Sequence, residues 1–407
     1  MNILVLGINH APEPVGIGPY TAGMVAALAA AGHRVRLVTA KPYYPEWKLA
    51  PAARGTLYQR EHQGGIDVRR CPLYVPRNPS GARRIVHHLS FALAALPPML
   101  AAAARFRPDL VLTIAPSLLS APIARLAAWL ARARLWIHVQ DFEVEAAFAT
   151  GLLDGDGLPA RFARGFERAV LRSAEMVSSI SPQMCRRLEQ KGVAPGRVME
   201  FRNWADTDRI TPLNRPSDYR AEWGLGNRQV ALYSGNIGNK QGMEILVEVA
   251  QRLAARDDIV FVVCGEGPNR AKLEARAAGL SNIQFRPLQP ADRMGALLGL
   301  ASVHLLPQCA GAADLVLPSK LANMLASGRP VVATAAPATG IAREVEGCGL
   351  VTPPGDADAM AGAIAALIDD GALAASLGAA ARARAECCWS RRAILDGFVG
   401  RVGALAG

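Results

Sequence analysis

Short apolar runs alternate with alanine-rich segments of helical length through the first half of the chain. Residues 3–8 form an apolar run, residues 11–19 are rich in glycine and proline, residues 20–31 have the character of a helix, and residues 35–38 form a second apolar run. A strand, a glycine loop, a helix and another strand make up the repeating unit of a parallel sheet. Further apolar runs occur at residues 110–114, 135–139 and 176–180. They predict more strands, each covered on both faces.

A polar stretch with several prolines follows Asn203 and predicts a linker over residues 206–217. The alternation then restarts, with apolar runs at residues 230–233, 259–263, 303–306 and 331–334. We therefore expect an α/β protein with two doubly wound, Rossmann-like domains, at residues 1–205 and 206–389. Because ligands bind at the carboxyl ends of the strands in such sheets, a cleft between the two domains is the expected site.

Residues 85–104 carry no Lys, Arg, Asp or Glu, and a segment of this length is long enough to cross a bilayer. Pro97 and Pro98 in its middle and the polar His87 and His88 near its start argue against a membrane span. A crossover helix is the favoured interpretation. Because arginines flank the segment at both ends, a helix that lies on a membrane face is the second interpretation.

Composition excludes several classes of protein. With 407 residues, 51% hydrophobic and 19% charged, the chain is able to bury sizeable cores, which excludes a disordered, collagen-like or coiled-coil protein. Seven cysteines, and a start without a basic flank, favour a reduced, cytoplasmic protein. Residues 1–205 hold 25 Lys and Arg against 14 Asp and Glu, a difference of +11, whereas residues 206–407 hold 20 of each. A basic first half indicates an anionic partner such as phosphate, nucleic acid or a membrane surface, or simply solvated helix faces.

Glycine-rich loops follow apolar runs at corresponding places in the two halves. Gly16 and Gly18 precede the first helix, where glycines let the backbone approach a ligand and a helix N-terminus attracts an anion. An ordinary strand-to-helix turn is the alternative there. Residues 235–240, with Lys240, suit a diphosphate that backbone N–H groups cradle and the lysine neutralises. The loop lacks the spacing of a Walker loop, so we do not expect hydrolysis of nucleoside triphosphates.

Further glycine-containing turns occur at residues 264–268 and 317–332. In their order and spacing, these loops resemble the GT-B glycosyltransferases of family 4. The family's N-terminal glycine loop, its "NG-x-D" element and its "G-x-G-P" turn are similar to residues 16–18, 203–206 and 265–268. Residues 16–21, 138–143 and 318–321 resemble the colanic-acid type of exopolysaccharide glycosyltransferases in detail. The similarity covers nearly the whole chain.

The resemblance implies a fold, an activity and a place in the cell. The fold is GT-B, in which residues 1–205 bind the acceptor, residues 206–389 bind the donor, and a C-terminal helix at about 390–407 packs on the first domain. The activity is transfer of a sugar, with retention of configuration, from a UDP- or GDP-linked donor to a lipid-linked or saccharide acceptor. Such enzymes work at the cytoplasmic face of the membrane, so the implied partners are a nucleotide sugar, a lipid-linked saccharide and an anionic membrane surface.

The resemblance also implies roles for individual residues. The catalytic candidates are His138, Lys240 and Lys320. The candidates for donor binding are Gly16, Gly18, Gly235, Asn236, Gly238, Lys240, Gly265, Gly267, Pro318, Ser319, Lys320, Leu321 and Asn323. The candidates for acceptor binding are Tyr20, Gln140, Asp141 and Glu143. For His138 the alternative is a structural histidine, and for Asp141 and Glu143 it is capping of the next helix.

The chain departs from the family pattern at two places in the donor site. An arginine of the family is replaced by Asn236, whose amide binds phosphate without supplying charge. The family's pair of glutamates, eight residues apart, falls on Leu315, next to Asp314, and on Asn323. In the family the second glutamate holds a donor ribose, so the resemblance implies that Asn323 does so as a neutral group.

Other patterns are weaker. Asp-x-Asp triplets begin at Asp154, Asp206 and Asp356, but none follows an apolar strand, and no Cys/His set has ligand spacing, so we expect no essential metal and no other cofactor. Basic patches without interleaved aromatic residues give no support for nucleic-acid binding. A non-hydrolysing nucleotide-sugar epimerase and an inactive membrane-associated scaffold of the same fold remain as alternative functions.

Overall fold

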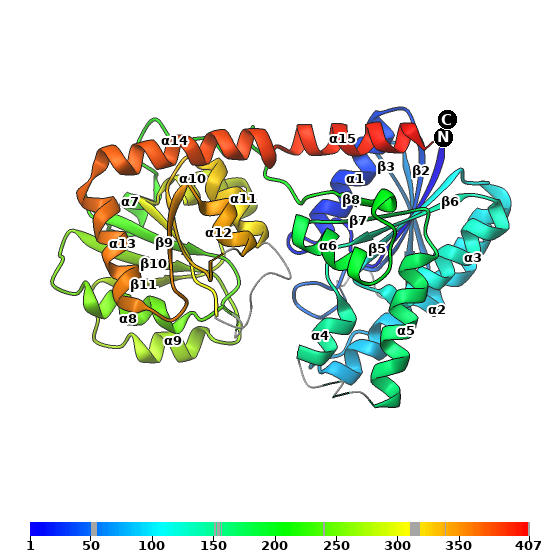
Figure 1. The fold of residues 1–407 in the computed structure, drawn as a ribbon, viewed down its shortest axis with the longest axis horizontal. Coiled ribbons are helices and arrows are strands. Elements are labelled where there is room, and N and C mark those ends of the chain that lie inside the picture. The colour runs from blue at the N-terminus through cyan, green and yellow to red at the C-terminus, as the bar shows by residue number, and fades with distance from the viewer. Residues whose placement is uncertain are drawn as a thin grey trace. The chain divides into compact units, whose positions relative to one another are not determined.

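The computed structural model describes residues 1–49, 55–149, 152, 155, 157–238, 241–309, 318–337 and 339–405. The chain divides into two compact units, each built around one sheet (Figure 1). The first unit is Met1–Arg202 together with Leu395–Gly407, and the second is Asn203–Ile394.

The sheet of the first unit has the strand order β3-β4-β2-β1-β5-β6-β7-β8, and every pair except β3 with β4 is parallel. Its strands are β1 (Asn2–Gly7), β2 (Arg34–Ala40), β3 (Gln59–Gln63), β4 (Ile66–Cys71), β5 (Leu110–Ala115), β6 (Arg134–Val139), β7 (Met176–Ser179) and β8 (Val198–Glu200). The strands expected from the apolar runs are confirmed. Burial of all six residues of β5 explains why such a strand reads as one continuous apolar run.

The antiparallel hairpin of β3 and β4 was not expected from the sequence. Its strands carry charged residues on both faces: Arg60 lies opposite Arg69 on one face, and Glu61 pairs with Arg70 at 2.6 Å on the other. Gly64 and Gly65 join the two strands with φ angles of 54° and 83°, in the left-handed region that glycine adopts readily. The hairpin extends the first sheet beyond the two apolar strands β1 and β2.

The helices of the first unit are α1 (Gly18–Ala30), α2 (Gly81–Arg105), α3 (Ala121–Ala131), α4 (Glu143–Ala149), α5 (Leu158–Arg172) and α6 (Pro182–Gln190), with short 3-10 turns η2 (Leu118–Ser120) and η3 (Pro195–Arg197). The crossover interpretation of residues 85–104 is confirmed, because Phe91, Ala95 and Met99 of α2 are fully buried in the core of this unit. Within the described residues, α2 is also long and apolar enough to span a membrane by length and composition.

The sheet of the second unit is entirely parallel, in the order β11-β10-β9-β12-β13-β14. Its strands are β9 (Gln229–Ser234), β10 (Ile259–Cys264), β11 (Ile283–Arg286), β12 (Val303–Leu306), β13 (Val331–Thr334) and β14 (Gly349–Thr352). Its helices are α7 (Tyr219–Glu222), α8 (Glu244–Arg252), α9 (Arg270–Arg276), α10 (Met294–Gly299), α11 (Ser319–Ala326), α12 (Gly340–Val345), α13 (Ala357–Asp369) and α14 (Gly371–Cys388), with a 3-10 turn η4 (Ala291–Arg293). The direction of winding reverses between β9 and β12, where ligands of doubly wound sheets bind.

The stretch after Asn203 is not a free linker, which corrects the expectation for residues 206–217. It belongs to the second unit, and Ile210 is buried in the core of that unit. The guanidinium of Arg382 donates hydrogen bonds to the carbonyls of Ile210 (2.6 Å) and Thr207 (3.0 Å). Polar and proline-rich composition therefore marks an irregular segment here, but one that is tied to the domain surface.

The last helix, α15 (Arg391–Ala404), returns the chain to the first unit, to which Leu395–Gly407 belong. Phe398 is fully buried and stacks on Phe201, with ring centroids 4.5 Å apart and an angle of 11° between the planes. The same ring meets Trp136 of β6 edge-on at 5.4 Å. Figure 1 shows both chain ends at the first unit. The core of this unit is formed by N-terminal residues together with residues from the end of the sequence.

Candidate functional site

Lys320 lies in the first turn of α11, beside the loop that follows β9. Its Nζ donates a hydrogen bond to the hydroxyl of Tyr233 (2.9 Å) and sits 4.2 Å from the centroid of the Tyr233 ring. A Cβ placed on Gly235 would lie 3.8 Å from the same Nζ. The structure thus brings together two predicted donor-binding residues, Lys320 and Gly235, at the point where the winding of the second sheet reverses.

The ammonium group of Lys320 has no carboxylate partner within the described residues. Burial lowers the pKa of Lys320 to about 7, because the charged form loses water and gains only a neutral hydroxyl and an aromatic ring. The first turn of a helix offers unpaired N–H groups in addition. A partly desolvated cation at a helix start is an arrangement that an anion would stabilise.

Gly265 and Gly267 belong to the turn that packs against the donor loop, residues 235–238, and this close packing leaves no room for a Cβ. A Cβ on Gly265 would lie 1.8 Å from the carbonyl oxygen of Gly235, and a Cβ on Gly267 would lie 2.3 Å from that of Ile237. The close approach is held by backbone hydrogen bonds from Gly235 N to Cys264 O (3.0 Å) and from Ile237 N to Glu266 O (2.8 Å). The "G-x-G-P" turn therefore supports the loop of residues 235–238 from behind.

Tyr233 and Gln241 are site residues that the sequence analysis missed. The hydroxyl of Tyr233 donates to the carbonyl of Asn236 (2.5 Å), and Gln241 Oε1 accepts from Gly238 N (2.9 Å). Together they fix the loop, while the Asn236 side chain stays exposed. The available signal was a hydroxyl-bearing residue at the end of an otherwise aliphatic strand, directly before the glycine loop.

The remaining donor-binding candidates differ in their surroundings. Leu321 is fully buried in the core of the second unit, so its predicted contact with the donor is wrong for the side chain. Pro318 precedes α11, Ser319 is exposed at its start, and Asn323 is half-buried one turn further on. Lys240, Asp314 and Leu315 lie outside the described residues.

In the first unit, the loop of Gly16 and Gly18 packs on Tyr44 and Glu13. Gly16 has a φ of 71°, and a Cβ there would lie 3.2 Å from the Tyr44 ring, while a Cβ on Gly18 would lie 3.0 Å from Cβ of Glu13. Buried Glu13 accepts hydrogen bonds from the backbone N–H groups of Tyr43 and Tyr44, both at 3.0 Å. Its carboxylate therefore anchors the loop, a role that the sequence analysis missed. Donor contact by Gly16 and Gly18 and acceptor contact by half-buried Tyr20 stay predictions.

His138 has the surroundings of a structural residue, which corrects its prediction as a catalytic contact. Its side chain is 1% exposed, and burial lowers its pKa to about 3. Gln140 Nε2 donates to His138 Nε2 (3.0 Å), which leaves the proton on Nδ1, and Nδ1 donates to Ser178 Oγ (2.9 Å). Both ring nitrogens are satisfied inside the unit, and Gln140, also buried, is directed at the histidine instead of at an acceptor.

Glu143 caps the start of η2 and not α4, the next helix, which the sequence had suggested as the alternative. Its carboxylate accepts hydrogen bonds from the backbone N–H groups of Ser117 (2.8 Å) and Leu118 (2.5 Å), at the start of η2. His88 Nε2 of α2 lies 3.5 Å from the same carboxylate. Glu143 thus ties three segments of the first unit together, whereas Asp141 is exposed and stays a candidate for acceptor binding.

The described residues contain no group of three His, Cys, Asp or Glu side chains able to hold a metal ion. Two of the Asp-x-Asp triplets have structural partners. Asp356 caps α13 by accepting from Ala359 N (2.8 Å), and Asp206 accepts from Arg209 N (3.2 Å). Asp154 and Asp156 lie outside the described residues.

Lowering the pH below 6.5 is expected to destabilise the protein through its buried histidines. Burial lowers the pKa to about 4 for His10, His87 and His88, and to about 3 for His138 and His304. The unfolded chain therefore binds more protons than the folded chain between pH 4 and 6.5. The free energy of unfolding should fall with falling pH by about 1.4 kcal/mol per pH unit for each histidine.

Urea unfolding at pH 7, 6 and 5 measures this loss. His138→Gln should remove part of the pH dependence, whereas a substitution of the exposed His62 should leave it unchanged. The same pH dependence in wild type and His138→Gln would contradict the expectation.

Two Rossmann-like units of parallel strands, the second with a lysine and a glycine loop at its switch point, define a GT-B glycosyltransferase. The chain belongs to the family 4 type of these enzymes: residues 15–204 match the glycosyl transferase 4-like domain, and residues 228–370 match the glycosyl transferases of group 1.

A curated relative supports the same family. The colanic acid biosynthesis glycosyl transferase WcaI of Escherichia coli (strain K12) is 44% identical over 343 residues, which cover 82% of this chain and 83% of that protein. The chain is therefore a glycosyltransferase of polysaccharide biosynthesis.

Solved structures share the fold across their whole length. Sucrose-phosphate synthase from Thermosynechococcus elongatus superimposes with a TM-score of 0.75 at 20% identity and full coverage of both chains. Anabaena HepE, in a complex with UDP-glucose, has a TM-score of 0.69 at 17% identity and covers 98% of this chain and 99% of its own.

Proposed function

We propose that this enzyme transfers a sugar, with retention of configuration, from a UDP- or GDP-linked donor to a lipid-linked or saccharide acceptor during the synthesis of an exopolysaccharide. The observation that carries the proposal is the position of Lys320, a partly desolvated cation at the start of α11 and beside Gly235. The UDP-glucose complex of HepE supports a nucleotide-sugar donor, and the relation to WcaI supports a polysaccharide product.

The proposed chemistry is stabilisation of a departing diphosphate. The bond from the anomeric carbon to the donor phosphate oxygen breaks through an oxocarbenium-like state, and the electron pair stays on that oxygen. Lys320 and the first turn of α11 stabilise the negative charge, and Asn236 donates a neutral hydrogen bond. The acceptor hydroxyl forms the new bond to the anomeric carbon and gives its proton to the departing phosphate, so the reaction needs no side-chain nucleophile. Lys240 is proposed as a second cation at the diphosphate.

We propose that transfer needs neither a metal ion nor another cofactor. Lys320 supplies the positive charge that a metal would otherwise bring to the diphosphate. Of the aspartates in the described triplets, Asp206 and Asp356 hold backbone N–H groups and Asp358 pairs with Arg252 at 2.5 Å. Full turnover in the presence of EDTA would support this proposal, and restoration of lost turnover by Mg²⁺ or Mn²⁺ would contradict it.

The decisive experiment measures nucleotide release by the full chain from UDP- and GDP-sugars, with and without vesicles that contain a polyprenyl diphosphate-linked saccharide. Release that requires the acceptor supports transfer, and NMR of the product linkage tests retention. Conversion of the donor into an epimer without acceptor would contradict transfer and favour the epimerase alternative. Absence of binding to both UDP and GDP in calorimetry would favour an inactive scaffold.

We also propose that the first unit places the enzyme on the cytoplasmic, anionic face of a membrane. On α2 the side chains of Ile85, Val86, Leu89 and Leu93 are 46–62% exposed, although the helix is otherwise packed on the sheet. The charge excess of +11 over residues 1–205 complements an anionic surface. Exposed apolar side chains next to basic ones are the pattern of helices that lie in a membrane interface.

Replacing Leu89 and Leu93 together with glutamine is expected to weaken binding of the full chain to anionic vesicles by about 10-fold or more. Two half-exposed leucines each contribute roughly 1 kcal/mol when the membrane covers them. Sedimentation with vesicles measures the effect, and about 0.5 M salt should release the wild-type chain because it screens the electrostatic attraction.

Leu288→Gln, an equally exposed leucine of the second unit, is the matched control and should bind as the wild type does. Equal weakening by Leu288→Gln, or salt-insensitive binding, would count against this surface.

A further inference from the structure

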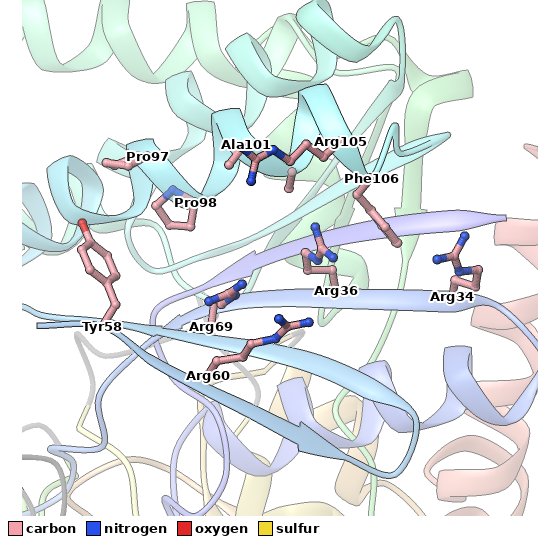
Figure 2. A pocket seen from close by; sticks show the side chains of 11 residues that line it. Arg34, Arg36, Tyr58, Arg60, Arg69, Pro97, Pro98, Ala101, Arg105 and Phe106 are labelled. Carbon is pink, nitrogen blue, oxygen red and sulfur yellow. The ribbon is translucent and has the colours of Figure 1, made fainter. Parts of the chain in front are cut away.

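A cavity of about 590 Å³ lies under the second half of α2 in the first unit. Its lining consists of Arg34, Arg36, Tyr58, Arg60, Arg69, Pro97, Pro98, Ala101, Ala102, Arg105 and Phe106. Figure 2 shows Arg34, Arg36 and Arg69 along the strands on one side and Pro97, Pro98 and Arg105 along the helix on the other. Five arginines thus line one cavity, which is partly open to solvent.

The strand pattern explains how the arginines gather. Side chains alternate between the two faces of a strand, so Arg34 and Arg36 of β2 share one face. The register places Arg36 opposite Asp67 of β4, and Arg60 of β3 opposite Arg69 of β4. The β3–β4 hairpin therefore adds two arginines to the face that α2 covers, and Arg105 closes the cavity from the helix.

The cavity has more positive charge than the described residues neutralise. Asp67 pairs with Arg36 (3.0 Å) and with Arg60 (3.1 Å). Neither Arg69 nor Arg105 has an ion pair with another described residue. A guanidinium group does not deprotonate in proteins, so repulsion in the cavity is not relieved by loss of a proton. An anion that enters the cavity relieves it.

The arginines are also arranged for recognition. The guanidinium of Arg36 lies 4.6 Å from the centroid of the Phe106 ring and that of Arg34 lies 5.7 Å from it, so one ring orients both groups. The hydroxyl of Tyr58 is fixed by donation to the Ala94 carbonyl (3.0 Å). Oriented guanidinium groups bind phosphate oxygens in pairs, with more directional specificity than lysine offers.

An exposed apolar row leads along α2 to the cavity. Every fourth residue from Ile85, namely Leu89, Leu93, Pro97 and Ala101, is exposed and apolar, and the next in the row is Arg105. Residues four apart lie on one side of a helix. Pro97 and Ala101 belong to both the row and the cavity lining.

We propose that this cavity is a binding site for a phosphate-bearing anion, separate from the donor loop of the second unit. Two sources share that chemistry: the headgroup of an anionic lipid, whose chains would follow the apolar row, and a soluble di- or polyphosphate. The site is independent of the glycosyl-transfer chemistry proposed above, because none of its residues belongs to the unit that holds Lys320.

Calorimetric titration of the full chain with inorganic pyrophosphate at about 0.15 M salt tests the site. The double variant Arg69→Gln and Arg105→Gln should bind pyrophosphate about 10-fold or more weakly, because each arginine contributes charge-assisted hydrogen bonds. The matched control is Arg186→Gln with Arg197→Gln, which removes the same charge from exposed positions of the same unit. The affinity of this control for pyrophosphate should stay within about 2-fold of that of the wild type. Equal weakening in the two double variants would overturn the proposal.

A second arm distinguishes the two sources. If the natural ligand is a lipid headgroup, vesicles that contain phosphatidic acid should displace pyrophosphate from the wild type, and vesicles of phosphatidylcholine alone should not. If pyrophosphate binding is unaffected by either vesicle, the source is a soluble phosphate. The affinity for UDP or GDP at the donor loop should be unchanged in both double variants, because that loop belongs to the second unit. If the proposed transferase activity is wrong, turnover will be absent from the wild type and from all variants alike. The differences in pyrophosphate affinity between the variants would still test the cavity.

Discussion

Replacing Lys320 with glutamine is expected to lower the rate of sugar transfer by about 10²–10³-fold while the second unit stays folded. Loss of one preorganised group that stabilises developing charge has an effect of this size. The Nζ of Lys320 lies beside Gly235 and has a neutral hydroxyl as its hydrogen-bond partner, so its charge is available to a diphosphate. Nucleotide release at saturating donor and acceptor measures the change.

The control variant is Lys272→Gln, which removes an exposed lysine of the same unit that pairs with Glu244 at 3.1 Å. It should keep wild-type turnover. Turnover of the Lys320→Gln enzyme within about 3-fold of that of the wild type would contradict the role of Lys320. A rate factor that small corresponds to well under 1 kcal/mol of transition-state stabilisation.

The pH dependence of donor affinity gives the same assignment an independent readout. Because burial lowers the pKa of Lys320 to about 7, the free enzyme loses this charge as the pH rises through 7, while a bound diphosphate would raise the pKa again. Affinity for UDP or GDP should therefore fall between pH 7 and 9. Lys320→Arg should remove this loss, since arginine stays charged.

The stability of the Lys320→Gln variant separates function from folding. The unfolded chain holds the proton of a lysine up to pH 10.5, whereas the folded chain releases it near pH 7, so the folded state is destabilised by the charge at and below neutral pH. The variant should therefore be at least as stable as the wild type at pH 6. A large loss of stability there would show that the drop in turnover reflects misfolding.

Gly265→Ala is expected to destabilise the second unit by more than about 4 kcal/mol and to abolish donor binding. The added Cβ would lie 1.8 Å from the carbonyl oxygen of Gly235, which is backbone and has no freedom to rotate away. The residue also has a φ of 154°, which favours glycine. Clashes of this kind belong to the small set of mechanisms that produce such large effects.

The control for Gly265→Ala is Gly279→Ala in the same unit. Gly279 also has a positive φ, 88°, but a Cβ there meets nothing within 4 Å. Its substitution should cost about 1–2 kcal/mol, the usual penalty for this backbone conformation. Similar losses of unfolding free energy for the two variants would show that the contact with Gly235 is not what requires glycine at position 265.

The arrangement of the sheets was predictable because buried parallel strands must be apolar along their whole length. The runs at residues 110–114 and 259–263 therefore mark β5 and β10 without ambiguity. Strands rich in polar residues escaped the same argument: β3 is polar at every position, and β4 carries three charged residues among six. The linker expected at residues 206–217 failed for a related reason: polar composition does not reveal a distant partner such as Arg382, which holds the segment through its backbone carbonyls.

The candidate site was predictable only in part. Lys320 and Gly235 meet as the motif order indicated, because loops at the carboxyl ends of adjacent strands share one edge of a sheet. His138 and Leu321 were misjudged, since a motif fixes a position in the chain and not the direction in which the side chain points. The buried carboxylate of Glu13 acts on backbone groups, which leave no pattern in the sequence, whereas the only signal for Tyr233 was its hydroxyl near the end of an apolar strand.

The return of α15 has a consequence for biosynthesis. Residues 395–407 complete the first unit, so the first unit gains its last helix only after the whole of the second unit, residues 203–394, has been synthesised. Domains usually fold in the order of their synthesis. Here the later domain is the first to have all of its residues, and the surface that Phe398 covers on Phe201 and Trp136 stays open to chaperones or to aggregation until the final helix emerges.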